Sequence, residues 1–455
     1  MNFKQAINEN AQLKAMYEHL VIKTSMGRDM LFNMEFSTDK DFLTKQYELT
    51  SKCQKFLSSI NNNEKMLLEC VLYDIHNITG SLKLIERNEI LDDIGLFEIK
   101  AFCLACCELN KLLKNLDCKD FLLNEFTDII NLLDPEGNKV RQFYVYNAYD
   151  SRLSSLRSEF EKLKQTDDNK VANIYNEILE IESIVREEIC SKIRPKIAEL
   201  QKAVSQIALL DISIAKAELN VLFNLTQPKI NDSVITYKKM FNPIVQEHLK
   251  KHGKTFQPID INIDNRTMLI TGANMAGKTV ILKTLALNQY LAQFGFFVAS
   301  ESADICLTEG ILTSIGDNQD ENQGLSSFAS EILTLNNIVK QIKTKKRFLI
   351  LADELARTTN PIEGIKLLNG FITTVNLGNS FAVVTTHYSN ITASCLRMRV
   401  KGFINKNLTP PISIANLSDN IDYSLIEDTS NEIPTEALNL CRLLGVDETW
   451  LNNCN

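Results

Sequence analysis

The chain has 455 residues, of which 44% are hydrophobic and 23% charged, a composition typical of a globular protein with material for more than one core. Its 49 Lys and Arg residues against 57 Asp and Glu give a formal net charge of −8, which excludes a globally basic surface and leaves only a local patch for binding a polyanion. The polar N-terminus, the lack of an apolar run of about 18 residues and the 11 cysteines without a secretory leader predict a cytoplasmic chain with free thiols and no membrane segment.

Residues 1–150 are expected to form a helical core domain, because apolar residues recur at three- and four-residue spacings and prolines and glycines are sparse. A cysteine cluster in this segment, Cys103, Cys106 and Cys107, includes the C-x-x-C spacing of metal and redox sites. These positions also share one face of a helix, and neither a second cysteine pair nor a nearby histidine accompanies them. We therefore interpret them as buried core thiols.

Residues 151–225 are predicted to form a long helical hairpin, a lever or clamp whose tip is able to contact a partner. Leu153, Leu156 and Phe160 alternate steps of three and four, as a packed helical seam requires. The pattern stops at 166–169, resumes, and is expected to bend at Pro195. Seven basic residues stand against eight acidic ones between positions 164 and 202, which favours a solvated face over a clamp that grips DNA.

Residues 226–260 are expected to form a linker with short helical or strand pieces, and residues 261–455 a second domain. In that domain strand patterns alternate with helix patterns, which predicts an α/β layer whose last part is an antiparallel edge. The expected strands are 267–270, 296–298, 311–315, 347–352, 381–385, 397–403 and 412–414.

A glycine-rich loop follows the first of these strands. Residues 272–279 fit the phosphate-loop pattern G-x-x-x-x-G-K-[ST] at every fixed position, and an apolar helix pattern follows. The glycines let backbone N–H groups face phosphate oxygens at a helix N-terminus. Lys278 is expected to reach the β- and γ-phosphates of ATP, and the Thr279 hydroxyl to bind Mg²⁺. The predicted nucleotide-binding residues are Gly272, Ala273, Asn274, Met275, Ala276, Gly277, Lys278 and Thr279.

A second apolar strand, 347–352, ends in the adjacent carboxylates Asp353 and Glu354. From the end of such a strand Asp353 can hold Mg²⁺ through water, and Glu354 can polarise the attacking water. The two patterns together predict an ATPase, with Glu354 and Lys278 as catalytic residues and Thr279 and Asp353 as metal ligands.

Four blocks, in order along the chain, resemble the MutS family, the ATPases named for DNA mismatch repair. Residues 271–279 look like its T-G-P-N-M-x-G-K-[ST], with Ala273 in place of the usual proline. Residues 324–331 look like its G-x-S-T-F-x-x-E, residues 353–364 like its D-E-I-G-R-G-T-S-T-x-D-G, and residues 386–388 like its T-H-Y. The resemblance implies an α/β P-loop ATPase domain of the ABC type, preceded by a mostly α-helical core and lever domain.

The resemblance also implies a composite ATP site in a homodimer or a related heterodimer, with Ser326 of one subunit facing the nucleotide held by the other. It further implies that His387 senses the γ-phosphate, that Phe256 stacks on adenine and that Asn274 helps to orient phosphate or water. From the residues alone, Ser326 can instead be a helix N-cap, His387 a structural histidine and Phe256 a core residue.

Two functions stay open at this point. Family resemblance favours an ATP-driven dimer whose levers close around duplex DNA. The chain shows nothing similar to the family's mismatch-reading domain, and its short acidic body resembles the ATPase of a reactivase for the B12-dependent lysine 5,6-aminomutase, which favours an ATP-driven chaperone of a protein partner. A third, non-enzymatic function is a nucleotide-locked scaffold, against which the intact Lys278, Thr279, Asp353 and Glu354 argue.

Overall fold

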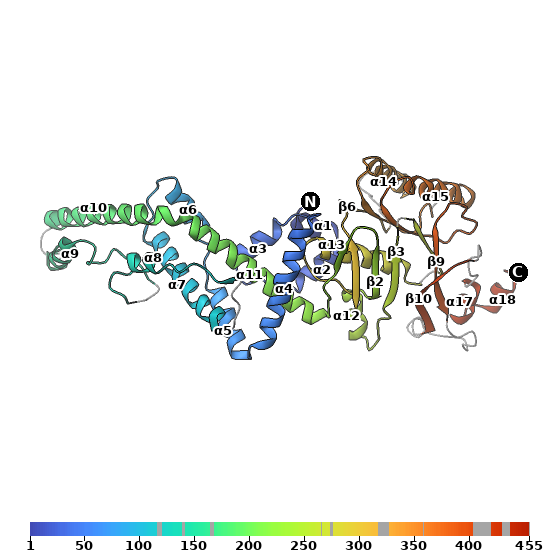
Figure 1. The fold of residues 1–455 in the computed structure, drawn as a ribbon, viewed down its shortest axis with the longest axis horizontal. Helices are drawn as coiled ribbons and strands as arrows, with labels where there is room; N and C mark the ends of the chain where they lie inside the picture. The colour runs from blue at the N-terminus through green and yellow to red at the C-terminus, as the bar shows by residue number, and fades with distance from the viewer. Residues whose placement is uncertain are drawn as a thin grey trace. The chain divides into compact units, whose positions relative to one another are not determined.

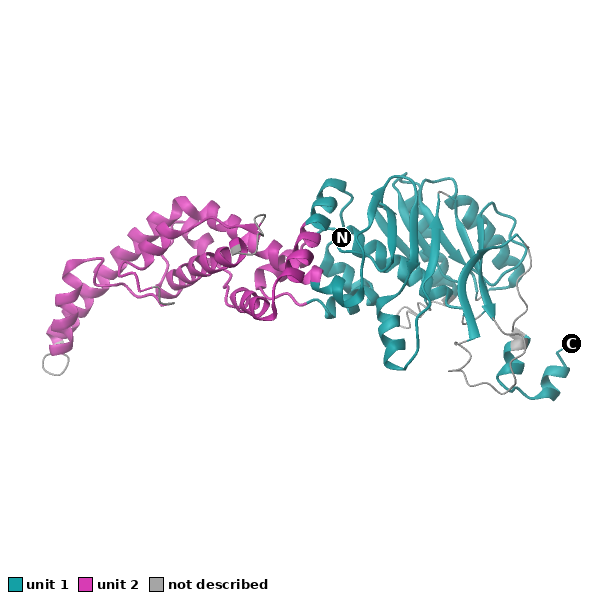
Figure 2. Ribbon diagram, turned by 60° about the horizontal axis from the view of Figure 1, so that its bottom comes forward, with its two compact units in different colours: residues 1–20, 34–48, 218–455 teal, residues 21–33, 49–217 magenta. Residues whose placement is uncertain are grey.

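The chain divides into two compact units (Figure 2). In the computed structural model the described residues are 1–115, 121–138, 142–163, 168–264, 266–273, 276–316, 327–357, 359–403, 420–429 and 437–454. Unit 1 comprises residues 1–20, 34–48 and 218–455, and unit 2 comprises residues 21–33 and 49–217. The division into four segments drawn from the sequence remains a prediction; in the structure, two stretches of the N-terminal segment belong with the C-terminal one.

The described residues of unit 2 form helices and their connecting loops, and none of them forms a strand. Side-chain caps define the ends of several helices; the Asn61 side chain, for example, accepts from the Glu64 backbone N–H at 3.0 Å, while the Glu64 carboxylate accepts from the Asn61 N–H at 2.9 Å. Its helices are α3 (Ser25–Phe32), most of α4 (Lys40–Ser59), α5 (Asn62–Tyr73), α6 (Thr79–Glu86), α7 (Asp93–Asn115), α8 (Thr127–Leu133), α9 (Ser151–Leu163), α10 (Asp168–Ile193), the 3-10 turn η2 (Arg194–Lys196) and most of α11 (Ile197–Phe223).

Helices α9 and α10 pack against each other along the predicted seam (Figure 1). Leu153 is fully buried, and the Phe160 and Tyr175 rings lie 5.7 Å apart. Pro195 lies in η2, between α10 and α11, at the position where the sequence predicts a bend, since proline removes a helical hydrogen bond.

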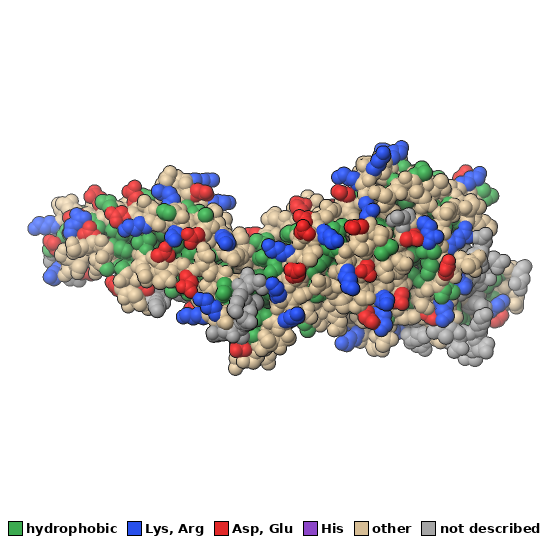
Figure 3. Space-filling view, in the orientation of Figure 1, with side chains coloured by type: hydrophobic (Ala, Val, Ile, Leu, Met, Phe, Trp, Pro, Cys, Tyr) green, Lys and Arg blue, Asp and Glu red, His purple; other side chains and the backbone are tan. Residues whose placement is uncertain are grey.

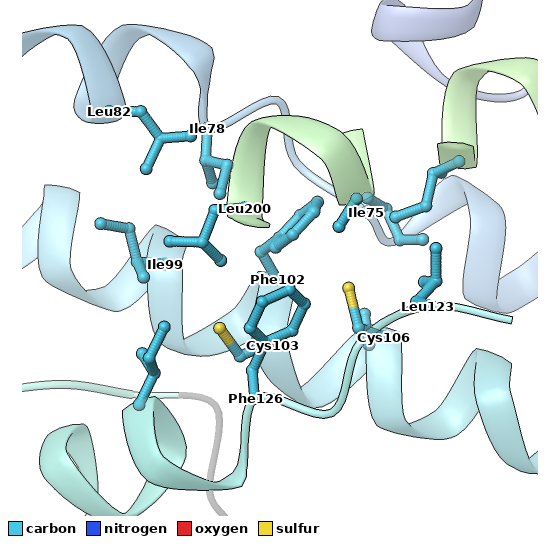
Figure 4. Packing of buried hydrophobic residues seen from close by; sticks show 14 of the residues in the cluster. Ile75, Ile78, Leu82, Ile99, Phe102, Cys103, Cys106, Leu123, Phe126 and Leu200 are labelled. Carbon is cyan, nitrogen blue, oxygen red and sulfur yellow. The ribbon is translucent and has the colours of Figure 1, made fainter. Parts of the chain in front are cut away.

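The cysteine cluster on α7 belongs to the core of unit 2. Cys103 and Cys106 are fully buried beside Phe102, Phe126 and Leu200 (Figure 4). Burial raises the pKa of both thiols. In the described part of the chain no group of three or more His, Cys, Asp or Glu side chains is arranged to hold a metal ion. The interpretation as buried core thiols is confirmed for Cys103 and Cys106, whereas Cys107 is only half-buried.

Unit 1 combines helices with two mixed β-sheets. Among the described residues, a four-stranded sheet has the order β1 (Lys229–Asn231), β5 (Ser302–Cys306), β2 (Ile235–Met240) and β3 (Ile259–Ile263). The helices outside the sheets are α1 (Phe3–Glu9), α2 (Ala11–Glu18), α12 (Pro243–Lys251), α13 (Lys278–Gln293), α14 (Ser327–Ile342), α15 (Pro361–Val375), α17 (Ala437–Leu443) and α18 (Glu448–Asn452). Residues 226–260, expected to form a linker, contribute β1, β2 and α12 and bury Tyr237 and Met240.

The strand predicted at 296–298 is wrong. Gly295, with φ +72°, ends the helical turn after α13, and the next two residues are irregular. Val298 forms only an isolated bridge with Thr226, and the strand of this region is β5. The apolar side chains of Phe296 and Phe297 are buried although their backbone is not a strand. Phe296 stacks on Phe3 with ring centroids 5.8 Å apart. A short apolar run does not distinguish a strand from a buried irregular segment.

The second sheet carries the motifs. Among the described residues it has six strands in the order β10 (Ile421–Glu427), β9 (Leu396–Phe403), β4 (Met268–Thr271), β8 (Phe381–Thr385), β7 (Phe348–Ala352) and β6 (Gly310–Ser314). Strands β9 to β6 are parallel, and β10 pairs antiparallel with β9, so the predicted antiparallel edge is confirmed. The strand expected at 412–414 lies outside the described residues.

This sheet is covered on both faces, which explains its continuous apolar strands. Leu349 and Leu351 of β7 join a core that includes α13, whereas Phe348, Ile350 and Ala352 join the opposite core with α14 and α15 (Figure 1). The alternation follows the two-residue period of a strand. No helix in the described part of the chain is long and apolar enough to cross a membrane.

Candidate functional site

Three neighbouring parallel strands bring the sequence motifs to one edge of the six-stranded sheet. Strands β4, β8 and β7 are adjacent, and residues 272–277, 386–388 and 353–354 follow their carboxyl ends. Since parallel strands all end at the same edge, the glycine-rich loop, the histidine segment and the two carboxylates lie together there. Crevices at the carboxyl ends of such strands are where open α/β sheets bind ligands.

The glycine-rich loop adopts a backbone that side chains disfavour. Gly272 and Gly277 have φ of +152° and +77°. A Cβ at Gly277 would lie 3.1 Å from the Tyr423 ring, and one at Gly272 would lie 3.2 Å from Val400 Cβ. Helix α13 begins directly after Gly277, so its free N–H groups point toward the loop. Ala273 and Ala276 flank the two predicted loop residues that lie outside the described residues, Asn274 and Met275.

Lys278 is buried at the start of α13 with its charge held beneath the loop. It is 5% exposed, and its Nζ donates to the Gly272 carbonyl at 2.9 Å and the Ala273 carbonyl at 3.1 Å. The same nitrogen lies 3.6 Å from Glu354 Oε1, and Glu354 Oε2 lies 3.3 Å from an Arg357 nitrogen. A buried cation therefore lies between the loop and the predicted catalytic carboxylate.

Asp353 accepts hydrogen bonds from two elements, helix α13 through Thr279 and strand β8 through Thr385. Its Oδ2 accepts from the Thr279 hydroxyl at 2.6 Å, and its Oδ1 accepts from the Thr385 hydroxyl at 2.6 Å. Thr385 Oγ1 in turn accepts from the Glu354 backbone N–H at 2.9 Å. Sequence reasoning missed Thr385, although a hydroxyl residue immediately before the T-H-Y block was the signal available.

The remaining predicted residues are placed as follows. His387 is exposed, and its ring centroid lies 4.5 Å from that of buried Tyr388. Ser326 lies outside the described residues; α14 begins at the next residue. Phe256 is half-buried and, like Gly277, lines a cavity.

That cavity has a volume of about 260 Å³ and adjoins the glycine-rich loop. Its walls include Phe256, Gly277, Val280 and Tyr423, and most of its surface is apolar. Gln257, another wall residue, joins two segments of the wall: its side chain accepts from the Tyr423 N–H at 3.0 Å and donates to Asp422 at 2.8 Å. Sequence reasoning also missed Tyr423, because β10 lies beyond the four motif blocks and only the sheet brings it to the loop.

Residues 268–416, which carry this edge of the sheet, match the family described as MutS domain V. This part of the chain is similar to MutS domain V. The family predicted from the four blocks is thereby confirmed, and so is the coarser fold class, a mixed helical and α/β chain. The P-loop topology of the ABC type remains a prediction.

Relatives from several bacteria support the same family. The chain is 28% identical over 300 residues to an endonuclease MutS2 of Caldanaerobacter subterraneus, an alignment covering 62% of this chain and 35% of that protein. It is 32% identical over 252 residues to a DNA mismatch repair protein MutS of Carboxydothermus hydrogenoformans, covering 54% and 29%. It is 35% identical over 218 residues to an endonuclease MutS2 of Acetivibrio thermocellus, covering 47% and 26%.

The aligned part of the chain thus spans only between about a quarter and about a third of the length of these relatives. These relatives carry MutS and MutS2 names, so the resemblance to an aminomutase reactivase has no support from them and stays a prediction.

Proposed function

We propose that the chain binds ATP and Mg²⁺ at the carboxyl edge of the six-stranded sheet and hydrolyses the ATP there. The observation that carries this proposal is the hydrogen-bonded set Thr279, Asp353 and Thr385, with Lys278 and Glu354 beside it. A phosphate-loop lysine, a hydroxyl on the first turn of a helix and two strand-end carboxylates are the groups that phosphoryl transfer uses in such ATPases. The MutS domain V match over the same residues agrees with it.

The donor set fits a hard divalent cation. Thr279 Oγ1 and Asp353 Oδ2 are 2.6 Å apart at the surface of the loop, and hydroxyl and carboxylate oxygens suit Mg²⁺, which keeps several waters. When bound, Mg²⁺ neutralises charge that develops on the phosphate oxygens during transfer. Thr385 keeps Asp353 in place by donating to its second oxygen, so the carboxylate presents the oxygen next to Thr279.

The other side chains of the site have separate proposed roles in binding and hydrolysing ATP. Lys278 places a positive charge at the loop, where its Nζ can exchange the two loop carbonyls for phosphate oxygens. Glu354 acts as the general base that orients water and takes its proton, and its backbone is fixed to Thr385. His387, exposed at the end of β8, is proposed to sense the γ-phosphate, and Ser326 of a second subunit to complete the site.

The apolar cavity lined by Phe256 and Tyr423 is proposed to hold the adenine. We expect Phe256→Ala to weaken ATP affinity about 5- to 150-fold, because stacking of an aromatic ring on a base contributes about 1–3 kcal/mol. Affinity for inorganic tripolyphosphate, which lacks a base, is expected to stay within about twofold. Titration calorimetry with both ligands checks this, with Phe42→Ala as a control at another phenylalanine of unit 1 that is 37% exposed. Equal losses for ATP and tripolyphosphate would place the base elsewhere.

We further propose that the chain acts as a dimer on duplex DNA, with ATP-driven closure transmitted through the helices of unit 2. Support comes from the relatives, one of which is named a DNA mismatch repair protein. Lys and Arg side chains are interspersed with Asp and Glu on the surface shown in Figure 3. Two arginines of the α9–α10 pair, Arg157 and Arg186, already form ion pairs with Glu182. DNA binding therefore has to rely on a few local phosphate contacts.

The test is the ATPase rate with and without duplex DNA at two salt concentrations. We expect DNA to raise the rate at low salt and the effect to fade at high salt, since each phosphate contact contributes about −0.9 to the slope of log affinity against log salt. An ATPase rate indifferent to DNA at both concentrations, together with no DNA binding at low salt, contradicts the DNA proposal. That outcome favours the alternative of a protein partner and leaves the ATPase proposal intact.

A further inference from the structure

The turn that carries the proposed catalytic base has an unfavourable backbone. Glu354 and Ala356, both with side chains, have φ of +48° and +61°, in the left-handed region that favours glycine. Two such residues in one short turn persist only where the surrounding structure holds them. The groups that hold this turn therefore also fix where Glu354 points.

Ala356 is held through both of its backbone polar groups. Its N–H donates to Glu331 Oε1 at 2.7 Å, and its carbonyl accepts from the Tyr388 hydroxyl at 2.6 Å. Ala356 is fully buried and Tyr388 is 6% exposed, so water cannot readily replace either bond. Glu331 lies near the start of α14, and Tyr388 follows β8, so two separate elements hold the turn.

Both partners are themselves fixed by their surroundings. Burial raises the pKa of Glu331, while the Ala356 N–H and the Arg357 charge act in the opposite direction. The Tyr388 hydroxyl lies against α15 at a glycine: a Cβ on Gly364 would be 2.5 Å from its oxygen. Tyr388 also donates its backbone N–H to the Thr386 hydroxyl at 3.0 Å. The tyrosine is thus fixed at both its ring end and its backbone.

We propose that Glu331 and Tyr388 are positioning residues for ATP hydrolysis, which act together through Ala356 to hold Glu354 in its productive orientation. This inference rests on the proposed ATPase function. Neither residue touches the nucleotide site in the described structure, and their effect is exerted through the backbone of the turn. The bond from the Ala356 N–H to Glu331 links the start of α14 to the turn that carries Glu354.

The test separates the hydrogen bond from the ionic charge at position 331. We expect Glu331→Ala to lower the kcat for ATP about 10- to 100-fold with the KM for ATP within about threefold, because nucleotide binding does not use the turn. Glu331→Gln keeps an acceptor oxygen for the Ala356 N–H and is expected to keep kcat within about threefold of the unchanged protein. Glu48→Ala, at an exposed carboxylate on α4 outside the motif blocks, is the matched control and is expected to leave kcat unchanged.

A second variant tests the joint action. Tyr388→Phe removes only the hydroxyl bond to Ala356 and is expected to lower kcat about 5- to 50-fold, again with KM preserved. The double variant Glu331→Ala, Tyr388→Phe is expected to lose less than the product of the single losses, because both bonds hold one turn. Melting temperatures are measured for each variant, and Tyr388→Phe supplies the test if Glu331→Ala fails to fold.

The inference is overturned if Tyr388→Phe and Glu331→Ala turn over ATP as fast as the unchanged protein, or if their losses appear in KM alone. That result leaves the proposed function intact as long as Glu354→Gln stops hydrolysis. An unchanged protein that binds ATP without hydrolysing it removes the proposed function, and the positioning role with it.

Discussion

Replacing Glu354 with glutamine is expected to stop ATP turnover while ATP stays bound. The amide has nearly the same shape but cannot take a proton from water, and loss of a general base costs about 10²- to 10⁴-fold in rate. The Glu354 backbone N–H still donates to Thr385, so the turn is kept. The loss of the carboxylate removes a negative charge 3.6 Å from Lys278 Nζ, which leaves that cation available to phosphate. Single-turnover hydrolysis and equilibrium binding of ATP, measured on the same preparation, check the two halves of the expectation.

Glu48→Gln is the control for this substitution, since the same chemical change is made at an exposed position of α4 outside the motif blocks. Hydrolysis by Glu354→Gln at the rate of the unchanged protein would contradict the assignment of the base. If the unchanged protein binds ATP and releases no phosphate at all, the non-enzymatic scaffold is the better interpretation, and the strand-end carboxylates then serve only to bind.

Local pattern was sufficient to predict the sheet edge that forms the site. Strand β8 occupies residues 381–385, as expected, because an apolar run of that length between helix patterns is typical of a strand covered on both faces. The phosphate-loop pattern predicted a helix after the loop, and α13 begins at Lys278. Thr279 and Asp353 were both predicted as metal ligands, and in the structure they share a hydrogen bond. In each case the signal lies within about ten consecutive residues, which is the range over which backbone period and loop chemistry act.

Groups brought in by tertiary structure were beyond that range. Thr385 contacts Asp353 only because β7 and β8 are neighbours, and Tyr423 reaches the loop only because β10 is at the edge of the same sheet. Glu331 belongs to a motif block that gives it no role of its own, and its bond to Ala356 depends on how α14 packs on the sheet. The strand predicted at 296–298 is wrong because an apolar run indicates burial, and burial does not determine whether the backbone is extended or irregular.

The charge of the chain also limits how the proposed ATPase can act on DNA. With a formal net charge of −8, DNA is not attracted to the molecule as a whole, so a DNA-dependent function requires that binding be local and that nucleotide control it. Binding of a protein partner does not require a local basic patch. Nucleotide binding is thus the step common to both proposals, and a variant that removes it removes either function.

Lys278→Met is the variant expected to remove nucleotide binding. Lys278 is buried and its Nζ makes two hydrogen bonds to loop carbonyls, so it is already directed at the position where phosphate oxygens are proposed to lie. Hydrogen bonds from a charged group contribute about 1.5–3 kcal/mol, which predicts a loss of ATP affinity of about 10- to 150-fold. Methionine keeps the length and most of the volume of the lysine stem, so the fold around the loop is retained.

Lys283→Met is the matched control, because Lys283 lies on the same helix but is exposed. Both variants lose one positive charge from α13, so long-range electrostatic effects on ATP are similar for the two, and the difference between their dissociation constants isolates the contribution of the buried position. Calorimetric titration with ATP in the presence of Mg²⁺ measures that difference, and far-ultraviolet circular dichroism checks the fold. Equal affinities for the two variants would mean that the buried ammonium does not meet the phosphates, and the site would then have to lie away from the glycine-rich loop.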